Sequence, residues 1–213
     1  SSLMKLIKTL LTILFISLLS SPSWSMTIDD LVTREGIYYP KFSEVPFTGK
    51  ITGKQQGSIK NGQKEGAFVY YSDSGQIVRK GNWKNGQKEG AWVSYHKGGQ
   101  LERKGNWKNG KEEGAWVSYH KNGQLYVKRN FKNGKMEGLW VQYYENGQLK
   151  SKGNFKNALW DGAWVYYHKN GQLSSKGNYK NGKMEGAWVS YYEDGIVSRS
   201  FTGTYTDGVK ISD

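Results

Sequence analysis

The sequence predicts an all-β protein, a single-layer antiparallel β-meander or solenoid of six 24-residue β-hairpin repeats. Three observations lead to this fold class. Glycines recur with a fixed period of 24 residues over residues 57–200. Asn-Gly pairs, the strongest short-range signal for a hairpin turn, recur in step with these glycines. The segments between turns are short runs of aromatic and β-branched residues, and no segment after residue 26 keeps the 3.6-residue period of a helix.

Residues 1–25 have the layout of a secretory signal peptide. Lys5 and Lys8 precede the apolar run 10–19, and the small residues Ser23 and Ser25 follow it. An ordinary membrane span needs about 20 apolar residues, so this run is too short to be one. We therefore expect cleavage after Ser25 and a periplasmic or extracellular protein, with an uncleaved amphipathic anchor as the alternative. The lack of cysteine is compatible with an oxidising compartment.

The rest of the chain divides into an N-terminal capping segment (26–56), six hairpin repeats (57–200) and a C-terminal half-repeat cap (201–213). Each repeat is expected to form one hairpin, and successive hairpins join in a meander. Two positions depart from the pattern: Arg129 replaces a repeat glycine, and Asn157-Ala158 replaces an Asn-Gly pair. A type I′ turn needs positive φ at both central residues, which strains alanine, so we expect the loop at Ala158 to take another shape.

Composition limits the function classes. The chain has 31 Lys+Arg against 18 Asp+Glu, a formal net charge of +13, but export argues against nucleic acid as a partner. The absence of cysteine excludes disulfides, thiolate catalysis and cysteine-based zinc sites. A repeated unit without a Ser-His-acid motif or a phosphate-binding glycine loop also argues against an enzyme. We therefore expect no catalysis, no cofactor and no metal.

Two charged or titratable columns have a structural and a functional interpretation. The histidines alternate with tyrosines in one column, which indicates a surface aromatic position rather than a metal site. Equivalent acidic residues of successive repeats are expected two strands apart, a separation of about 9–10 Å. Two carboxylates at that separation are too far apart to share one calcium ion. Solvated turn charges are therefore the favoured interpretation of this column, which comprises Glu65, Glu89, Glu113, Glu137, Asp161 and Glu185.

Three further columns form the candidate binding-surface ladder. Alternate strand residues face opposite sides, so Trp92 and Tyr95 are expected on opposite faces, and both faces carry aromatic rings. In a single layer, stacked aromatic rings must replace a core, yet they remain available to a ligand. The loop length leaves open whether Leu101 pairs with Tyr95 or His96. The columns are Trp92, Trp116, Trp140, Trp164 and Trp188; Tyr95, Tyr119, Tyr143, Tyr167 and Tyr191; and Lys80, Lys104, Lys128, Lys152 and Lys176.

The repeat resembles the MORN-variant repeats of bacterial proteins. The resembling motif is G-x-W-x-x-Y-x-x-N-G-Q-L-x-x-x-G-x-Y/F/W-x-N-G-K-x-x-G, and it covers residues 57–200. The resemblance implies a scaffold that binds proteins or, in some relatives, membrane phospholipid. Many relatives carry an antitoxin label, and the resemblance implies such a role here as well. A repeat motif of this kind identifies a fold and not an activity.

The sequence thus predicts a non-enzymatic, exported repeat scaffold that mediates protein–protein interaction in the cell envelope, with an antitoxin- or immunity-like role as a special case. The partner expected is an unidentified protein. The alternative is binding of cell-wall glycan or anionic lipid through the aromatic and lysine ladders. Salt separates these interpretations, because binding to a polyanion weakens between low and moderate salt while aromatic stacking on sugars does not.

Overall fold

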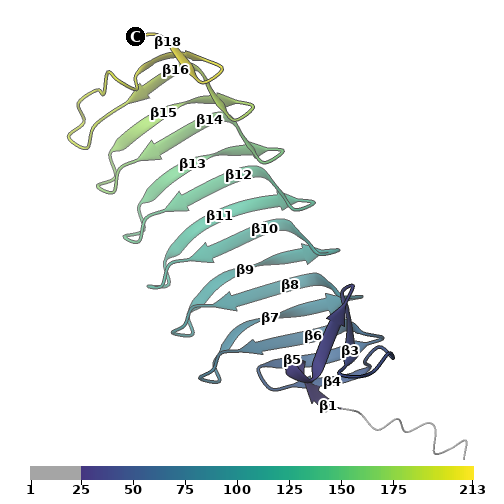
Figure 1. The fold of residues 1–213 in the computed structure, drawn as a ribbon. Coiled ribbons are helices and arrows are strands. Elements are labelled where there is room, and N and C mark those ends of the chain that lie inside the picture. Colours follow the sequence, from purple (N-terminus) through teal and green to yellow (C-terminus); the bar gives the residue numbers. More distant parts are fainter. Residues whose placement is uncertain (1–24) are drawn as a thin grey trace, which may run out of the picture.

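The computed structural model describes residues 25–213, which form one open, twisted sheet of 16 strands and a separate two-stranded hairpin (Figure 1). From β4 to β18 every strand is hydrogen-bonded to its neighbours in the chain, so the sheet is a meander of consecutive hairpins. The all-β, single-layer antiparallel prediction is therefore confirmed. The expected signal peptide, apart from Ser25, lies outside the described residues. Within the described part, no helix is long and apolar enough to cross a membrane.

The N-terminal segment forms the first edge of the sheet and a cover over it. Strand β1 (Ser25–Thr27) pairs in parallel with β4 (Gly49–Thr52), and the 3-10 turn η1 (Ile28–Asp30) follows β1. Strands β2 (Leu31–Arg34) and β3 (Ile37–Pro40) form the separate hairpin.

The long sheet continues from β4 to the C-terminus in the order of the chain. Its strands are β5 (Gln55–Lys60), β6 (Gln63–Tyr71), β7 (Ile77–Lys84), β8 (Gln87–Tyr95), β9 (Leu101–Lys108), β10 (Lys111–Tyr119), β11 (Leu125–Lys132), β12 (Lys135–Tyr143), β13 (Leu149–Lys156), β14 (Leu159–Tyr167), β15 (Leu173–Lys180), β16 (Lys183–Ser190), β17 (Gly203–Thr206) and β18 (Val209–Ser212). The twelve strands β5–β16 are the two arms of six hairpins, as the 24-residue period predicts.

The turn inside each hairpin is the type I′ turn that Asn-Gly predicts. At Asn85-Gly86, for example, φ is 49° and 72°, and both values lie in the left-handed region that glycine and asparagine tolerate best. The turn between hairpins is different, because only its glycine has positive φ. There the Asn122 carboxamide oxygen accepts the backbone N–H of Gln124 at 3.0 Å, an Asx turn within a five-residue loop. The prediction of type I′ turns at 122–123, 146–147 and 170–171 is therefore wrong.

The turn at Asn157-Ala158 corrects a second expectation. Its φ angles, 53° and 66°, match those of the Asn-Gly turns, so the loop keeps the same shape although alanine is strained in it. The turn is held by its place in the sheet, where the Ala158 N–H donates to the Met136 carbonyl of the preceding repeat at 2.9 Å.

Replacing Ala158 by glycine should therefore stabilise the protein. We expect Ala158→Gly to raise the free energy of unfolding by about 0.5–1 kcal/mol, because relief of left-handed strain exceeds the entropy that glycine adds to the unfolded chain. Thermal melting of the purified protein measures this. The matched control is Gly134→Ala, which puts the same strain into the equivalent turn, at φ 80°, and should lower the melting temperature. A lower melting temperature for Ala158→Gly would contradict the argument.

The core lies on one face of the sheet, which we call the tryptophan face. Each indole stands on a glycine of the preceding strand: a Cβ added to Gly105 would lie 2.1 Å from the Trp116 ring. The Trp116 Nε1–H donates to the Asn106 carbonyl at 3.1 Å, and the ring meets Trp107 edge-on at 5.9 Å between centroids. The residues that define this face are the column Phe68, Trp92, Trp116, Trp140, Trp164 and Trp188 and the column Trp83, Trp107, Phe131, Phe155 and Tyr179.

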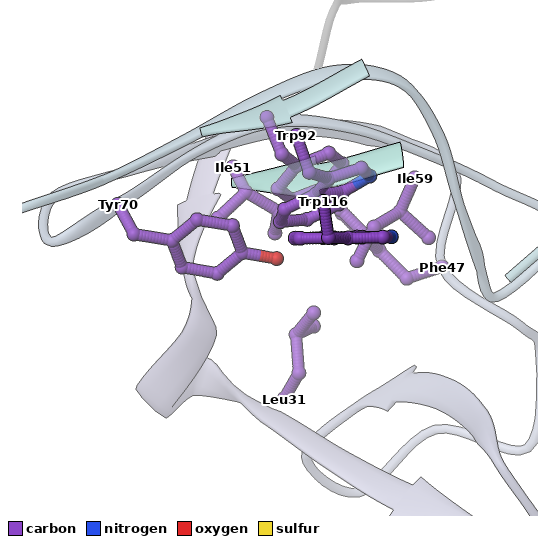
Figure 2. Packing of buried hydrophobic residues seen from close by; sticks show 8 residues of the cluster. Leu31, Phe47, Ile51, Ile59, Tyr70, Trp92 and Trp116 are labelled. Carbon is purple, nitrogen blue, oxygen red and sulfur yellow. The ribbon is translucent and has the colours of Figure 1, made fainter. Parts of the chain in front are cut away.

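Both ends of the tryptophan face are covered. At the N-terminal end, Leu31 of the β2–β3 hairpin and Phe47 are buried with Ile51, Ile59 and Phe68 in one hydrophobic cluster. Figure 2 shows Leu31 lying across from the layer of aliphatic and aromatic side chains that the sheet presents. At the other end Tyr205 is buried against the last two tryptophans. Between these ends no second layer of secondary structure covers the described sheet (Figure 1).

Candidate functional site

The structure separates the three columns of the predicted ladder. The opposite surface of the sheet, which we call the valine face, carries the valine column, because Val93 pairs directly with Lys80 and Lys104. The Tyr71 hydroxyl donates to Gln56, which pairs with Val69, so the tyrosine column belongs to the valine face as well. The tryptophans point the other way. A joint surface of tryptophan and lysine, as a single ladder would require, does not form.

The tryptophan column is mostly core. Trp92, Trp116, Trp164 and Trp188 are only 3–5% exposed, whereas Trp140 is half-buried. The tyrosine column, Tyr95, Tyr119, Tyr143, Tyr167 and Tyr191, is half-buried along the valine face. Loop geometry also settles the open register, because Leu101 pairs with Tyr95 across a β-bulge.

The lysine column is exposed on the valine face. Its members Lys80, Lys104, Lys128, Lys152 and Lys176 each pair with a valine on both sides. Towards the C-terminal repeats these lysines border a shallow groove of about 690 Å³, whose lining includes Leu139, Val165 and Val189. The groove combines apolar walls with ammonium groups at its rim.

The acidic column closes turns. The Glu89 carboxylate accepts the backbone N–H of Asn109, 20 residues further on, at 2.8 Å, and Glu65, Glu113 and Glu137 do the same in their own repeats. Each glutamate thus ties its hairpin to the next type I′ turn. These glutamates therefore have a structural role, as the favoured interpretation expects, and they fulfil it through defined hydrogen bonds to the backbone and not only as solvated charges.

The histidine column is a second ladder between repeats. The His96 Nε2 is 2.9 Å from the Tyr119 carbonyl of the next repeat. His120 and His168 make the equivalent contacts with the carbonyls of Tyr143 and Tyr191. Tyr144 donates its hydroxyl to Tyr167 at the same place. Within residues 25–213 no three His, Asp or Glu side chains converge as metal ligands would.

A cluster of cations on the tryptophan face is the candidate site, and we call it the basic groove. It comprises Lys64, Arg79, Lys88, Arg103 and Arg129, from β6, β7, β8, β9 and β11. Register places them on this face: Lys88 lies opposite Trp83, Arg103 opposite Ser94, and Arg129 opposite Trp116. The cations therefore run along four successive hairpins, from β5–β6 to β11–β12, beside the aromatic columns.

Each cation of the basic groove lies over an aromatic ring. The Lys88 ammonium is 4.2 Å from the Trp107 centroid, and the Arg103 guanidinium carbon is 4.0 Å from that of Trp116. Lys64 is the most enclosed, with four rings within 6 Å, and it donates to the Tyr70 hydroxyl at 3.2 Å. Cation–π attraction of this kind holds charged groups in a partly desolvated place.

The basic groove is strongly unbalanced in charge. Among the described residues, one carboxylate forms an ion pair with a cation of the groove: Glu112, which pairs with Arg103. Burial lowers the pKa of Lys64 from its ordinary value of 10.5 to about 8, and the charges of Arg79 and Lys88 add to the shift. Burial also lowers the pKa of Arg129, with the neighbouring Arg103 as the next cause. The groove is thus a place where positive charge is concentrated.

The low pKa of Lys64 predicts a pH dependence of stability. The unfolded chain takes up a proton near pH 10.5 and the folded chain only near pH 8, so the free energy of unfolding should rise with pH between these values. The largest slope for one proton is about 1.4 kcal/mol per pH unit. Urea unfolding at pH 7.5, 8.5 and 9.5 measures it for the wild type and for Lys64→Met. We expect the difference between the two proteins to shift in favour of the wild type as pH rises, and parallel curves would contradict the assignment to Lys64.

Arg129 interrupts the glycine floor under the tryptophans. The equivalent residues Gly57, Gly81, Gly105, Gly153 and Gly177 are all glycine, and the next strand lays its ring on each of them. Over Arg129 the ring of Trp140 is displaced: its Nε1–H donates to the Ser151 hydroxyl at 3.3 Å and not to a backbone carbonyl. Arg129 therefore places a guanidinium where the other repeats have an aromatic ring on glycine.

Sequence reasoning missed the basic groove. A repeat is recognised from columns that stay the same in every unit, whereas the groove residues change from unit to unit. In the other five units, for example, the position of Arg103 is occupied by Arg79, Val127, Ser151, Ser175 or Arg199. The usable signal was the reverse, the departure of Arg129 from a glycine column, together with Arg79 and Arg103 in the column two residues before the glycines Gly81 and Gly105.

Fold and site together define an open, single-layer β-repeat protein with both broad faces available for binding. The chain belongs to the MORN repeat variant family. The family model matches five consecutive 22-residue segments, together about half of the chain: 64–85, 88–109, 112–133, 136–157 and 160–181. MORN repeats are generally modules that bind proteins or membranes, so the fold carries a generic binding role.

Other comparisons add little. No curated protein sequence matches the chain. One solved structure, described as the crystal structure of a GtfA/B complex bound to UDP and GlcNAc, is similar to it at 13% identity. That match covers 74% of this chain and 27% of the other, with a TM-score of 0.18. The chain thus spans about a quarter of that protein's length, and a TM-score so low carries no argument.

Proposed function

We propose that the protein is a non-enzymatic, exported scaffold that binds a protein partner in the cell envelope, and that the basic groove is where the partner docks. The observation that carries the proposal is the groove itself. Lys64 is buried at the covered end, but Arg79, Lys88, Arg103 and Arg129 face one carboxylate on the part of the sheet that no second layer covers, and an acidic protein surface would complement them. Aromatic and arginine side chains are also the residues that dominate binding at protein interfaces.

Three further observations support parts of this proposal. The histidine and acidic columns, which would supply acid–base chemistry, are used in hydrogen bonds to the backbone, and this supports binding over catalysis. The layout of residues 1–25 supports export to the periplasm or the cell exterior. An antitoxin- or immunity-like role, in which the scaffold covers a secreted toxin, would use the same surface.

A second candidate function has its own observation. The exposed lysine column and the groove of about 690 Å³ on the valine face would suit a wall glycan or an anionic lipid, because apolar walls and a row of ammonium groups occur together there. The two candidates use opposite faces of one sheet. They can therefore be separated by substitutions that remove the same charge from one face or the other.

Affinity capture with face-specific variants tests the proposal. Purified protein is immobilised, exposed to an envelope extract of the source cell at moderate salt, and compared with Arg79→Gln/Lys88→Gln and with Lys80→Gln/Lys104→Gln. The proposal expects one near-stoichiometric protein on the wild type and on the valine-face variant, lost from the groove variant, that rebinds as a purified component. Retention of lipid or wall polymer that only the valine-face variant loses would overturn it in favour of the second candidate.

A further inference from the structure

The structure makes one part of the basic groove unlike the rest. Arg103 and Arg129 approach the same indole, because Arg103 lies over the Trp116 ring and Arg129 pairs with Trp116 across the ladder. Both arginines line a depression of about 600 Å³. Ser94 and Ser118 contribute hydroxyl groups to its wall. Two guanidinium groups and two hydroxyls thus line one hollow, and one of these guanidinium groups lies over the Trp116 indole.

The two arginines have donors that the protein itself does not use. Within the described chain, the Nε–H groups of Arg103 and Arg129 are buried without a hydrogen-bond acceptor. A buried donor without an acceptor is costly, and native proteins retain few of them. Glu112 occupies only the terminal nitrogen of Arg103. An incoming group that accepts hydrogen bonds would therefore satisfy both Nε–H groups.

The hollow occurs once in the part of the chain that the structure describes. Arg79 and Arg199 stand at the place of Arg103 in two other units, but Arg129 alone interrupts the glycine column beside such an arginine. In the other units the place of Arg129 is a glycine under an aromatic ring, Phe68 on Gly57 and a tryptophan on each of the rest, whereas Trp140 is displaced over Arg129 itself. The repeat therefore provides a ladder for stability, and its departure from the repeat provides a single asymmetric site.

We propose that the hollow formed by Arg103 and Arg129 binds the carboxylate of an aspartate or glutamate side chain on an acidic segment of the partner protein. This inference rests on the proposed function and names the chemistry of its contact. A guanidinium presents a planar fork that matches the two oxygens of a carboxylate, and stacking on the aromatic rings holds both forks in place. Glu112 on Arg103 is an example of the same pairing within the chain.

A side chain fits the hollow better than a membrane does. The guanidinium groups of Arg103 and Arg129 are half-buried beside rings, so the ligand must reach in on a narrow stem. The fully exposed cations that a flat anionic surface would meet lie on the valine face. Around the rim, Glu102 and Glu145 carry negative charge and His120 lies 3.9 Å from Glu145. Lys121 lines the same hollow, so the rim carries charges of both signs and is not the uniformly basic plane that an anionic membrane would need.

Fluorescence anisotropy with a labelled peptide of ten glutamates, at about 0.15 M salt, tests the inference on the whole protein, with a peptide of ten glutamines as the uncharged reference. Arg129→Gly removes one fork and restores the residue that five other units carry, so it should fold. Lys128→Gln is the matched control: it removes one charge from the adjacent residue, which faces the opposite side. We expect Arg129→Gly to weaken binding at least tenfold and Lys128→Gln less than twofold.

Arg129→Lys keeps the charge and loses the fork, so it should also weaken binding several-fold. Equal losses in Arg129→Gly and Lys128→Gln would overturn the inference, because net charge alone would then explain binding. Binding of phosphatidylglycerol vesicles that depends on Arg129, without binding of the peptide, would overturn it in favour of a headgroup phosphate. A captured partner that stays bound to Arg129→Gly would refute this contact and leave the proposed function standing. Peptide binding that needs Arg129, with no protein captured from the extract, would support this contact and count against the proposed function.

Discussion

Replacing Trp116 by alanine should destabilise the protein by about 3–5 kcal/mol, the usual cost of deleting a large buried ring. The indole is 3% exposed, donates to the Asn106 carbonyl, meets two further rings edge-on and carries the Arg103 guanidinium. In a single-layer sheet no second layer can move in to fill the cavity. Urea unfolding, followed by tryptophan fluorescence and far-ultraviolet circular dichroism, measures the effect.

The matched comparison is Tyr119→Ala, three residues further along the same strand. Tyr119 is half-buried on the valine face, so its loss should cost only about 1–2 kcal/mol. Equal effects of the two substitutions would show that the two faces contribute alike to stability. An unchanged melting temperature in Trp116→Ala would show that the indole is free for a ligand, and the assignment of the tryptophan face as the core would fail.

Gly105→Ala should be almost as damaging, although it adds only one methyl group. The new Cβ would lie 2.1 Å from the Trp116 ring, which is packed between neighbours and cannot move away cheaply. Overpacking of this kind costs about 2–3 kcal/mol. Gly98→Ala is the control, because its Cβ would meet only the flexible end of Gln100 in a loop. Thermal melting should therefore show a large drop for Gly105→Ala and little change for Gly98→Ala.

The reverse substitution, arginine to glycine at position 129, restores the residue on which the tryptophan ring of the next strand lies in other repeats. Arg129→Gly should raise the melting temperature, because the Trp140 ring can then lie on the backbone as its equivalents do. The protein would become more stable while it loses one arm of the hollow described above. A fall in melting temperature would mean that the contacts of Arg129 stabilise the protein more than a glycine floor under Trp140 does.

The architecture was predictable because local and global signals agree. The 24-residue glycine period and the Asn-Gly turns determine hairpins of fixed length, and alternation places Trp92 and Val93 on opposite faces. The turns between hairpins were predicted wrongly, because Asn122 uses its side chain to accept a hydrogen bond and so needs no positive φ. At Ala158 the neighbouring repeats impose a backbone shape that the residue itself disfavours.

The candidate site was less predictable, for a reason that lies in register. Arg103 joins the tryptophan face only because the loop and the bulge beside Tyr95 set it opposite Ser94. A slip of one residue would have turned the arginine to the other side, and the sequence left that choice open. The lysine column is visible as a row in the sequence, but only the pairing of Val93 with Lys104 shows that this row lies on the face opposite the tryptophans.

The two ends of the sheet are closed to different degrees, and this gives unfolding a direction. The β2–β3 hairpin seals the first strands, whereas β18 is a short edge strand on which Val209 and Ile211 remain exposed. Because each strand is stabilised chiefly by its immediate neighbours, the chain can open one hairpin at a time from the C-terminal edge. Arg103 and Arg129 lie on β9 and β11 in the middle of the sheet, several hairpins from that edge. The C-terminal hairpins can therefore unfold locally while the basic groove keeps its shape.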